Sequence, residues 1–87
     1  MNDESSLKFP CAFPIKMMGR DTPEFRETAR SLVEKHTGPV SDTAINDALS
    51  RKGNFVSITI TVNALSQEQL DDIYGDVSSH EDVLMAL

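Results

Sequence analysis

Apolar and polar residues alternate along two segments of the chain, and this alternation predicts two strands. In residues 13–18, Phe, Ile and Met occupy every second position, and the segment ends at Gly19. In residues 56–63, valine and isoleucine alternate with serine, threonine and asparagine. A period of two places successive side chains on opposite faces of a sheet. Each predicted strand therefore has one face for a core, and the second strand has a hydroxyl-rich face for solvent.

Two other segments carry start signals and apolar spacing that are typical of helices. The first begins with Thr22 as N-cap and Pro23 in its first turn, and the glycine–proline pair at 38–39 ends it. Its apolar stripe is Phe25, Ala29, Leu32, Val33 and His36. The second begins at Ser66, where Gln69 completes a capping box. Its buried face is predicted to be Leu70, Ile73, Tyr74 and Val77.

The remaining segments complete a βαββαβ order. Residues 40–50 indicate an irregular or edge strand, residues 51–54 a tight turn, and residues 82–87 a short final strand. With right-handed crossovers this order is the ferredoxin-like α+β sandwich, a four-stranded antiparallel sheet with two helices on one face. We expect residues 9–87 to form this single domain, after a disordered leader over residues 1–8.

The sheet face that points away from the helices is the surface on which we expect a partner to bind. Its predicted residues are Lys16, Ser57, Thr59 and Thr61. The sheet edges are a second place for contact, because their unpaired backbone groups can add a strand from a partner or from another copy of the chain.

Charge is distributed unevenly along the 87 residues. The chain has eight Lys and Arg against fourteen Asp and Glu, and residues 53–87 hold the whole net charge of −6. This balance excludes a sequence-independent nucleic-acid binder, which needs clustered cations. The acidic stripe of the second helix is predicted to be a solvated face that can dock a basic partner, with Arg26 and Arg30 of the first helix opposite it. The stripe is Glu68, Asp72 and Asp76.

Cysteine usage and hydropathy indicate a protein of the cytoplasm. Cys11 is the single cysteine, so no internal disulfide can form. The first residues are acidic and polar, unlike a secretory signal, and no apolar stretch approaches the roughly 20 residues of a membrane span. The sequence also predicts no metal and no cofactor.

Four chemistries occur commonly on this fold, and the residues distinguish among them. The outward strand positions lack the aromatic residues of an RNA-recognition motif, and one cysteine cannot make a metallochaperone site. An acylphosphatase-type hydrolase, with Arg20 holding a phosphate and Asn54 placing a water, stays as the alternative. A Cys–His nucleophilic site, which is not one of these four, is disfavoured because no orienting third group follows from the spacing. A non-enzymatic, ligand-sensing regulatory domain fits the residues best.

Several short motifs resemble the YbeD-like family of small bacterial proteins. The first is Phe9-Pro10 with Phe13, Lys16 and Met18-Gly19. The second is Lys52-Gly53-Asn54 with Ser57, Ile60-Thr61 and Ala64, and the third is the ending Asp82 to Leu87 with Met85. The resemblance extends over residues 7–87 and implies a fold like that of the ACT regulatory domain, which commonly binds amino acids or pairs sheets edge to edge.

The turn before the first helix is also similar to that of ACT domains, where the proline is normally followed by glycine. That glycine lets the backbone approach the ligand closely, whereas here the position after Pro23 is the bulky, charged Glu24. The resemblance implies a small regulatory or adaptor protein that acts by protein contact and senses a small metabolite at this turn. The residues of the implied ligand site are Gly19, Arg20, Asp21 and Thr22.

Overall fold

The computed structural model describes residues 7–87, so the predicted leader falls mostly outside the described residues. The elements follow the predicted βαββαβ order, with one short 3-10 turn, η1, before the second strand. They are β1 (Cys11–Arg20), α1 (Pro23–Thr37), η1 (Asp42–Ala44), β2 (Ile45–Leu49), β3 (Phe55–Ala64), α2 (Gln67–Ser79) and β4 (Met85–Ala86). No helix within these residues is long and apolar enough to cross a membrane.

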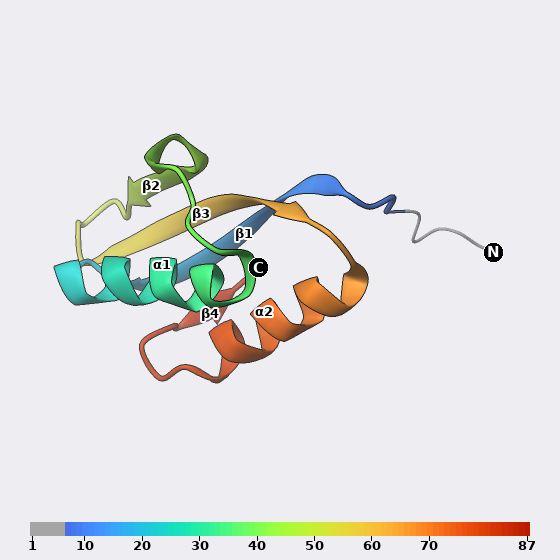
Figure 1. The fold of residues 1–87 in the computed structure, drawn as a ribbon. Coiled ribbons are helices and arrows are strands. Elements are labelled where there is room, and N and C mark those ends of the chain that lie inside the picture. The colour runs from blue at the N-terminus through green and yellow to red at the C-terminus, as the bar shows by residue number, and fades with distance from the viewer. Residues whose placement is uncertain (1–6) are drawn as a thin grey trace.

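The four strands form one antiparallel sheet in the order β2-β3-β1-β4. Strands β1 and β3 are the long central pair, and their register places Ile15 opposite Ile60. Strand β2 lies at one border of the sheet and pairs Ile45 with Ile60. Both helices cover the same face of the sheet, and the opposite face has no helix over it (Figure 1). This arrangement confirms the predicted ferredoxin-like, ACT-like fold.

The core lies between the sheet and the helices and consists of apolar residues from the period-two and helical patterns, whereas Tyr74, predicted to be buried, is half-buried at its border. Strands β1 and β3 supply Ile15, Met17, Val56, Ile58, Ile60, Val62 and Ala64. The helices supply Phe25, Ala29, Val33, Leu70, Ile73 and Val77. No polar or charged residue among those described is buried, so the energetics of the core are those of apolar packing.

Both helices begin where their capping residues predict. The Thr22 hydroxyl accepts a hydrogen bond from the Phe25 amide, and the Ser66 hydroxyl accepts one from the Gln69 amide. The Gln69 side chain accepts in turn from the Leu65 amide, at 2.8 Å. The two hydroxyl bonds satisfy N–H groups that the first turn of a helix leaves without partners, and the Gln69 bond fixes the residue before the cap.

The last strand is shorter than the predicted segment 82–87. The backbone turns first, because the amides of Val83 and Asp82 donate to the main-chain oxygen and the Nδ1 of His80. Strand β4 then has two residues, and flanking bonds from Leu84 and Leu87 attach it to β1. The other border of the sheet is therefore a short strand.

Candidate functional site

The open sheet face is the uncovered face of the sheet, and every strand contributes to it. It consists of Ala12, Pro14, Lys16, Met18, Arg20, Asn46, Ala48, Phe55, Ser57, Thr59, Thr61, Asn63 and Met85. The four residues predicted for this face lie on it, and the register sets Lys16 directly opposite Thr59 and Met18 opposite Ser57. The face combines hydroxyl groups with exposed apolar groups, among them Met85 at 51% exposure.

The charged side chains of the open sheet face are both cationic. Neither Lys16 nor Arg20 forms an ion pair with a carboxylate of residues 7–87. The guanidinium of Arg20 lies over the Phe55 ring, 5.6 Å from its centroid, in a cation–π contact. The net negative charge of the chain is thus carried by other surfaces of the molecule.

The turn over residues 19–22 has a structural role at three of its four positions. Gly19 is buried against the ring of Phe25, and Thr22 caps α1. Asp21 pairs with Arg26, and its amide donates to the Asn54 main-chain oxygen. A cavity of about 310 Å³ lies beside the turn, with Arg20, Glu24 and Glu81 in its lining. The ligand site at this turn stays a prediction.

The acidic stripe of α2 is divided between solvent and the contact of the two helices. Glu68 and Asp72 are exposed, whereas the Asp76 side chain is only 34% exposed. One carboxylate oxygen of Asp76 lies 2.6 Å from His36 Nε2 and 3.2 Å from Lys35 Nζ. These two residues lie in the last turn of α1, where a cation also favours the helix dipole.

The predicted pairing of Arg26 and Arg30 with this stripe is wrong. Arg26 pairs with Asp21 and Asp47, and Arg30 pairs with Glu34 and Asp42. Both arginines lie on the side of α1 that faces β2, whereas α2 is met by the end of α1 that bears Lys35 and His36. These partners could not be predicted because i, i+4 spacing shows which residues share a face of a helix. It does not show which other element packs against that face.

Acid is expected to weaken the Asp76 cluster. Hydrogen bonds from His36 and then from Lys35 lower the pKa of Asp76 below its ordinary value. Because the folded pKa is lower than the unfolded one, the carboxylate adds stability above the unfolded pKa and loses it as pH falls through the folded value. Urea unfolding at a series of pH values should show Asp76→Asn less stable than the wild type at pH 7, with the difference vanishing in acid.

The matched control for this experiment is Asp72→Asn. It removes the same charge from α2 at an exposed position that has no ion pair within residues 7–87. An equal pH dependence in the two variants would contradict a local role for Asp76 and would indicate a general effect of net charge.

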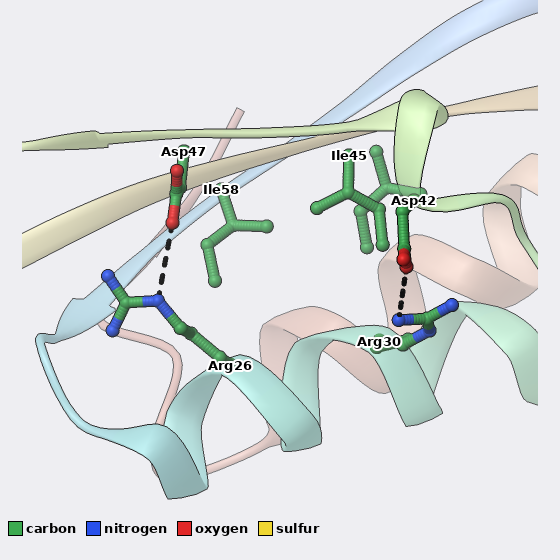
Figure 2. Close-up of a pocket in the computed structure, with 7 residues that line it drawn as sticks. Arg26, Arg30, Asp42, Ile45, Asp47 and Ile58 are labelled. Carbon is green, nitrogen blue, oxygen red and sulfur yellow. Dashed lines mark hydrogen bonds and ion pairs between the residues drawn. The ribbon is translucent and has the colours of Figure 1, made fainter.

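A slot between α1 and β2 is the site that sequence analysis did not anticipate. We call it the arginine slot, a cavity of about 280 Å³. Its lining is Arg26, Arg30, Asp42, Ile45, Asp47, Ile58 and Ile60. Figure 2 shows the two arginines reaching from α1 toward Asp47 and Asp42, with isoleucine side chains between the two ion pairs. The slot therefore has an aliphatic floor and a charged mouth.

The two ion pairs of the slot attach α1 to β2, through Asp47, and to the turn that leads into β2, through Asp42. Arg30 Nη1 lies 3.0 Å from Asp42 Oδ1, and Arg30 Nη2 donates to the Val40 main-chain oxygen at 2.8 Å. Glu34 accepts from the Val40 amide and from Arg30, and these bonds lower the pKa of its carboxyl. The connection between α1 and β2 is thus held by side chains of α1.

The outer edge of β2 has backbone groups that no described element uses. The Ser50 amide donates to Phe55, which shows that the even-numbered residues of β2 face β3. Asp47 and Leu49 consequently direct their N–H and C=O groups away from the sheet. An unpaired edge of this kind is a place where another strand can add.

The described residues offer little for catalysis. No group of three or more His, Cys, Asp or Glu side chains within residues 7–87 could hold a metal ion. Cys11 is a half-buried free thiol at the start of β1, and His36 and His80 are engaged with Asp76 and the Asp82 amide. Asn54, the other residue of the hydrolase alternative, uses its main-chain oxygen to fix the turn at Asp21.

Comparison with known proteins identifies relatives along nearly the whole chain. A "UPF0250 protein" of Paraburkholderia phytofirmans is 42% identical over 85 residues, 98% of this chain and 96% of the relative. "UPF0250 protein NE1487" of Nitrosomonas europaea is 37% identical over 87 residues and covers both chains fully. The solution structure of protein HP0495 from H. pylori superimposes with a TM-score of 0.70 at 18% identity, over 100% of this chain and 94% of that one.

The likeness to HP0495 concerns the fold alone, since the sequences are only 18% identical. The sequence relatives go further and confirm the resemblance to the YbeD-like family, because YbeD is a UPF0250 protein. The family model described as "Protein of unknown function (DUF493)" matches residues 4–87. This chain therefore belongs to the DUF493 family, whose members include the UPF0250 proteins.

Proposed function

We propose that this protein is a non-enzymatic regulatory or adaptor domain that acts by contact with another protein. The observation that carries the proposal is the open sheet face, which no element of residues 7–87 covers. It offers apolar groups, hydroxyl groups and two cations without a carboxylate partner, the mixture from which protein interfaces are made. The outer edge of β2 adjoins this face and adds backbone donors and acceptors.

Regulation through such a surface works by population shift. A partner that binds one conformation or one assembly more tightly than another changes their proportions by its difference in affinity. A small metabolite would act in the same way, and the cavity of about 310 Å³ beside Arg20 is the observation that favours this second candidate. Thermal-shift screening tests it, because a ligand at 100 times its Kd adds about 2.7 kcal/mol to the free energy of unfolding.

Affinity capture of the full chain from extract of its own cells tests the proposed contact. The wild type should retain a partner in stoichiometric amount, and the double variant Lys16→Glu/Thr59→Glu should lose it, because two carboxylates would stand where the open sheet face now has a cation and a hydroxyl. The control is Glu68→Lys/Asp72→Lys, which changes charge on α2 instead. Each variant is first shown to keep the wild-type melting temperature.

Two outcomes would contradict the proposal. One is retention of the same partner by the sheet-face variant and its loss from the α2 variant, which would place the contact on the acidic stripe. The other is hydrolysis of an acyl phosphate by the wild type and not by Arg20→Ala, which would favour the hydrolase alternative.

A further inference from the structure

We propose that the outer edge of β2 binds an extended segment of a partner, with a lysine or arginine of that segment beside Asp47 at the mouth of the arginine slot. This inference rests on the proposed function and deepens it, because it gives the partner's binding segment a conformation and a charge. Three features of the structure support it: the free backbone of β2, the accessibility of Asp47 and the charge around the slot.

The backbone of β2 is the better of the two long free edges in the sheet. Bonds from Leu84 and Leu87 to Met18 and Lys16 show that the even-numbered residues of β1 face β4. Strand β4 is too short to reach the first half of β1, so that part of β1 also has a free edge. Pro14 lies on that edge and has no N–H to donate. The edge of β2 has no proline and offers both groups at Asp47 and Leu49.

The side chains along this edge favour a particular pattern in the added strand. Asp47 points toward α1 and is 53% exposed, and Leu49, two residues on, is 59% exposed. Residues directly opposite in antiparallel strands are neighbours, and opposite charges there are favourable. In the added strand, a basic residue would therefore lie opposite Asp47. Apolar residues two positions before and after it would lie opposite Leu49 and Ile45.

The mouth of the slot carries more negative than positive charge. Four carboxylates, those of Asp21, Glu34, Asp42 and Asp47, surround the two guanidinium groups of Arg26 and Arg30. An anionic ligand would add a fifth negative group, whereas a cationic ligand would balance one of the two excess negative charges. The stem of a lysine side chain can lie along apolar surface while its ammonium stays in water. Ile45, two residues before Asp47 on the same face of β2, provides such a surface at the slot.

Asp47 can accept a new partner without leaving Arg26 unpaired. Arg26 binds Asp21 through Nη1, and its bond from Nε to Asp47 is the longer one at 3.3 Å. Exposed ion pairs of this kind contribute little to stability, so their exchange is easy. A second copy of this chain fits less well, because antiparallel pairing of two β2 edges centred on Asp47 would set two carboxylates opposite each other.

Synthetic peptides test this proposal with the full-length protein labelled with ¹⁵N. The probe is a capped nine-residue peptide in which valine and threonine alternate, with lysine in place of the central valine. Matched peptides carry norleucine or glutamate at that place. The lysine peptide should shift the amide signals of Asp47 and Leu49 and protect both amides from hydrogen exchange. It should bind about three-fold more tightly than the norleucine peptide and more tightly still than the glutamate peptide.

Two variants separate the roles of charge and backbone. Asp47→Asn should make the lysine and norleucine peptides equal, whereas Asp72→Asn should leave their difference unchanged. Leu49→Pro removes an outward N–H without removing a bond to β3, and it should abolish binding of all three peptides. Its melting temperature establishes that it is folded.

The proposal is overturned if no peptide shifts the β2 signals, if the shifts lie on the open sheet face or on α2, or if all three peptides bind equally. Loss of the lysine preference in Asp72→Asn would overturn it too. None of these outcomes alters the capture experiment on the open sheet face, so failure of this inference and failure of the proposed function can be told apart.

Discussion

Alanine in place of Gly19 should lower the free energy of unfolding by about 1–3 kcal/mol, although the change adds a single methyl group. A Cβ at this position would lie 2.5 Å from Cε1 and 2.6 Å from Cζ of the Phe25 ring. Phe25 is 2% exposed and occupies the first turn of α1, so its ring has no solvent into which to move. Either the helix shifts away from β1 or the ring leaves the core. Urea unfolding followed by circular dichroism measures the loss.

The chain provides a matched control at Gly75. This glycine lies inside α2, is exposed, and would have no atom within 4 Å of an added Cβ. Gly75→Ala should therefore raise the free energy of unfolding by about 1 kcal/mol, through helix propensity alone. Opposite signs for the two substitutions would confirm that close approach to Phe25 sets the requirement at Gly19. A neutral Gly19→Ala would contradict it.

A double-mutant cycle tests whether the contact between residues 19 and 25 is responsible. In Phe25→Leu the side chain no longer extends a ring toward β1, so the penalty of Gly19→Ala should shrink when the two changes are combined. An unchanged penalty would indicate a backbone effect. The result also bears on the predicted ligand site, because a glycine that packing requires needs no ligand to explain it.

The helices and strands could be predicted from the sequence because the interactions that define them join residues close to one another along the chain. Thr22 and Ser66 cap helices with hydrogen bonds that reach three residues along the chain. The alternation in residues 56–63 assigns Ile58 and Ile60 to the core and Thr59 to the open sheet face. The order of elements then leaves few arrangements of the sheet, because crossovers are right-handed.

The partners of charged residues could not be predicted in this way. Asp47 meets Arg26 across 21 positions of sequence, and His36 meets Asp76 across 40. These contacts depend on how α1 lies over the sheet and on where β2 begins. Neither is determined by the i, i+4 spacing of a helix face or by the alternation of apolar and polar residues in a strand. Among the ion pairs of residues 7–87, only that of Arg30 and Glu34, four residues apart on one helix, had a spacing that could have revealed it.

The arginine slot was missed for a related reason. Residues 40–50 have weak apolar periodicity because β2 is a border strand with Ile45 half-buried and the rest exposed. The slot lies between α1 and this border strand, so it depends on packing between elements. The open sheet face, in contrast, follows from the threonines of β3 and was predicted with its four residues.

Ile60→Ala should be the most destabilising of the single truncations considered, with a loss of about 2–5 kcal/mol. Ile60 is fully buried, lies between Ile15 and Ile45 in the sheet, and lines the floor of the arginine slot. A domain of this length has a stability of roughly 4–13 kcal/mol, so the variant would lose a large part of it. Ile60→Val should lose only about 0.5–1.5 kcal/mol, because one side-chain carbon is removed instead of three.

Thr59→Ala is the control for this experiment, and it also tests whether the open sheet face is free to bind a partner. Thr59 is the neighbour of Ile60 in β3 and lies on the open sheet face opposite Lys16, so its truncation should change stability by no more than about 0.5 kcal/mol. Unfolding measured over a hundred-fold range of protein concentration extends the test. If Thr59→Ala is as costly as Ile60→Ala, and its effect grows with concentration, then the open sheet face is covered by another copy of the chain in solution. A small effect that does not depend on concentration would mean that the face is free for a different partner, as the proposed function requires.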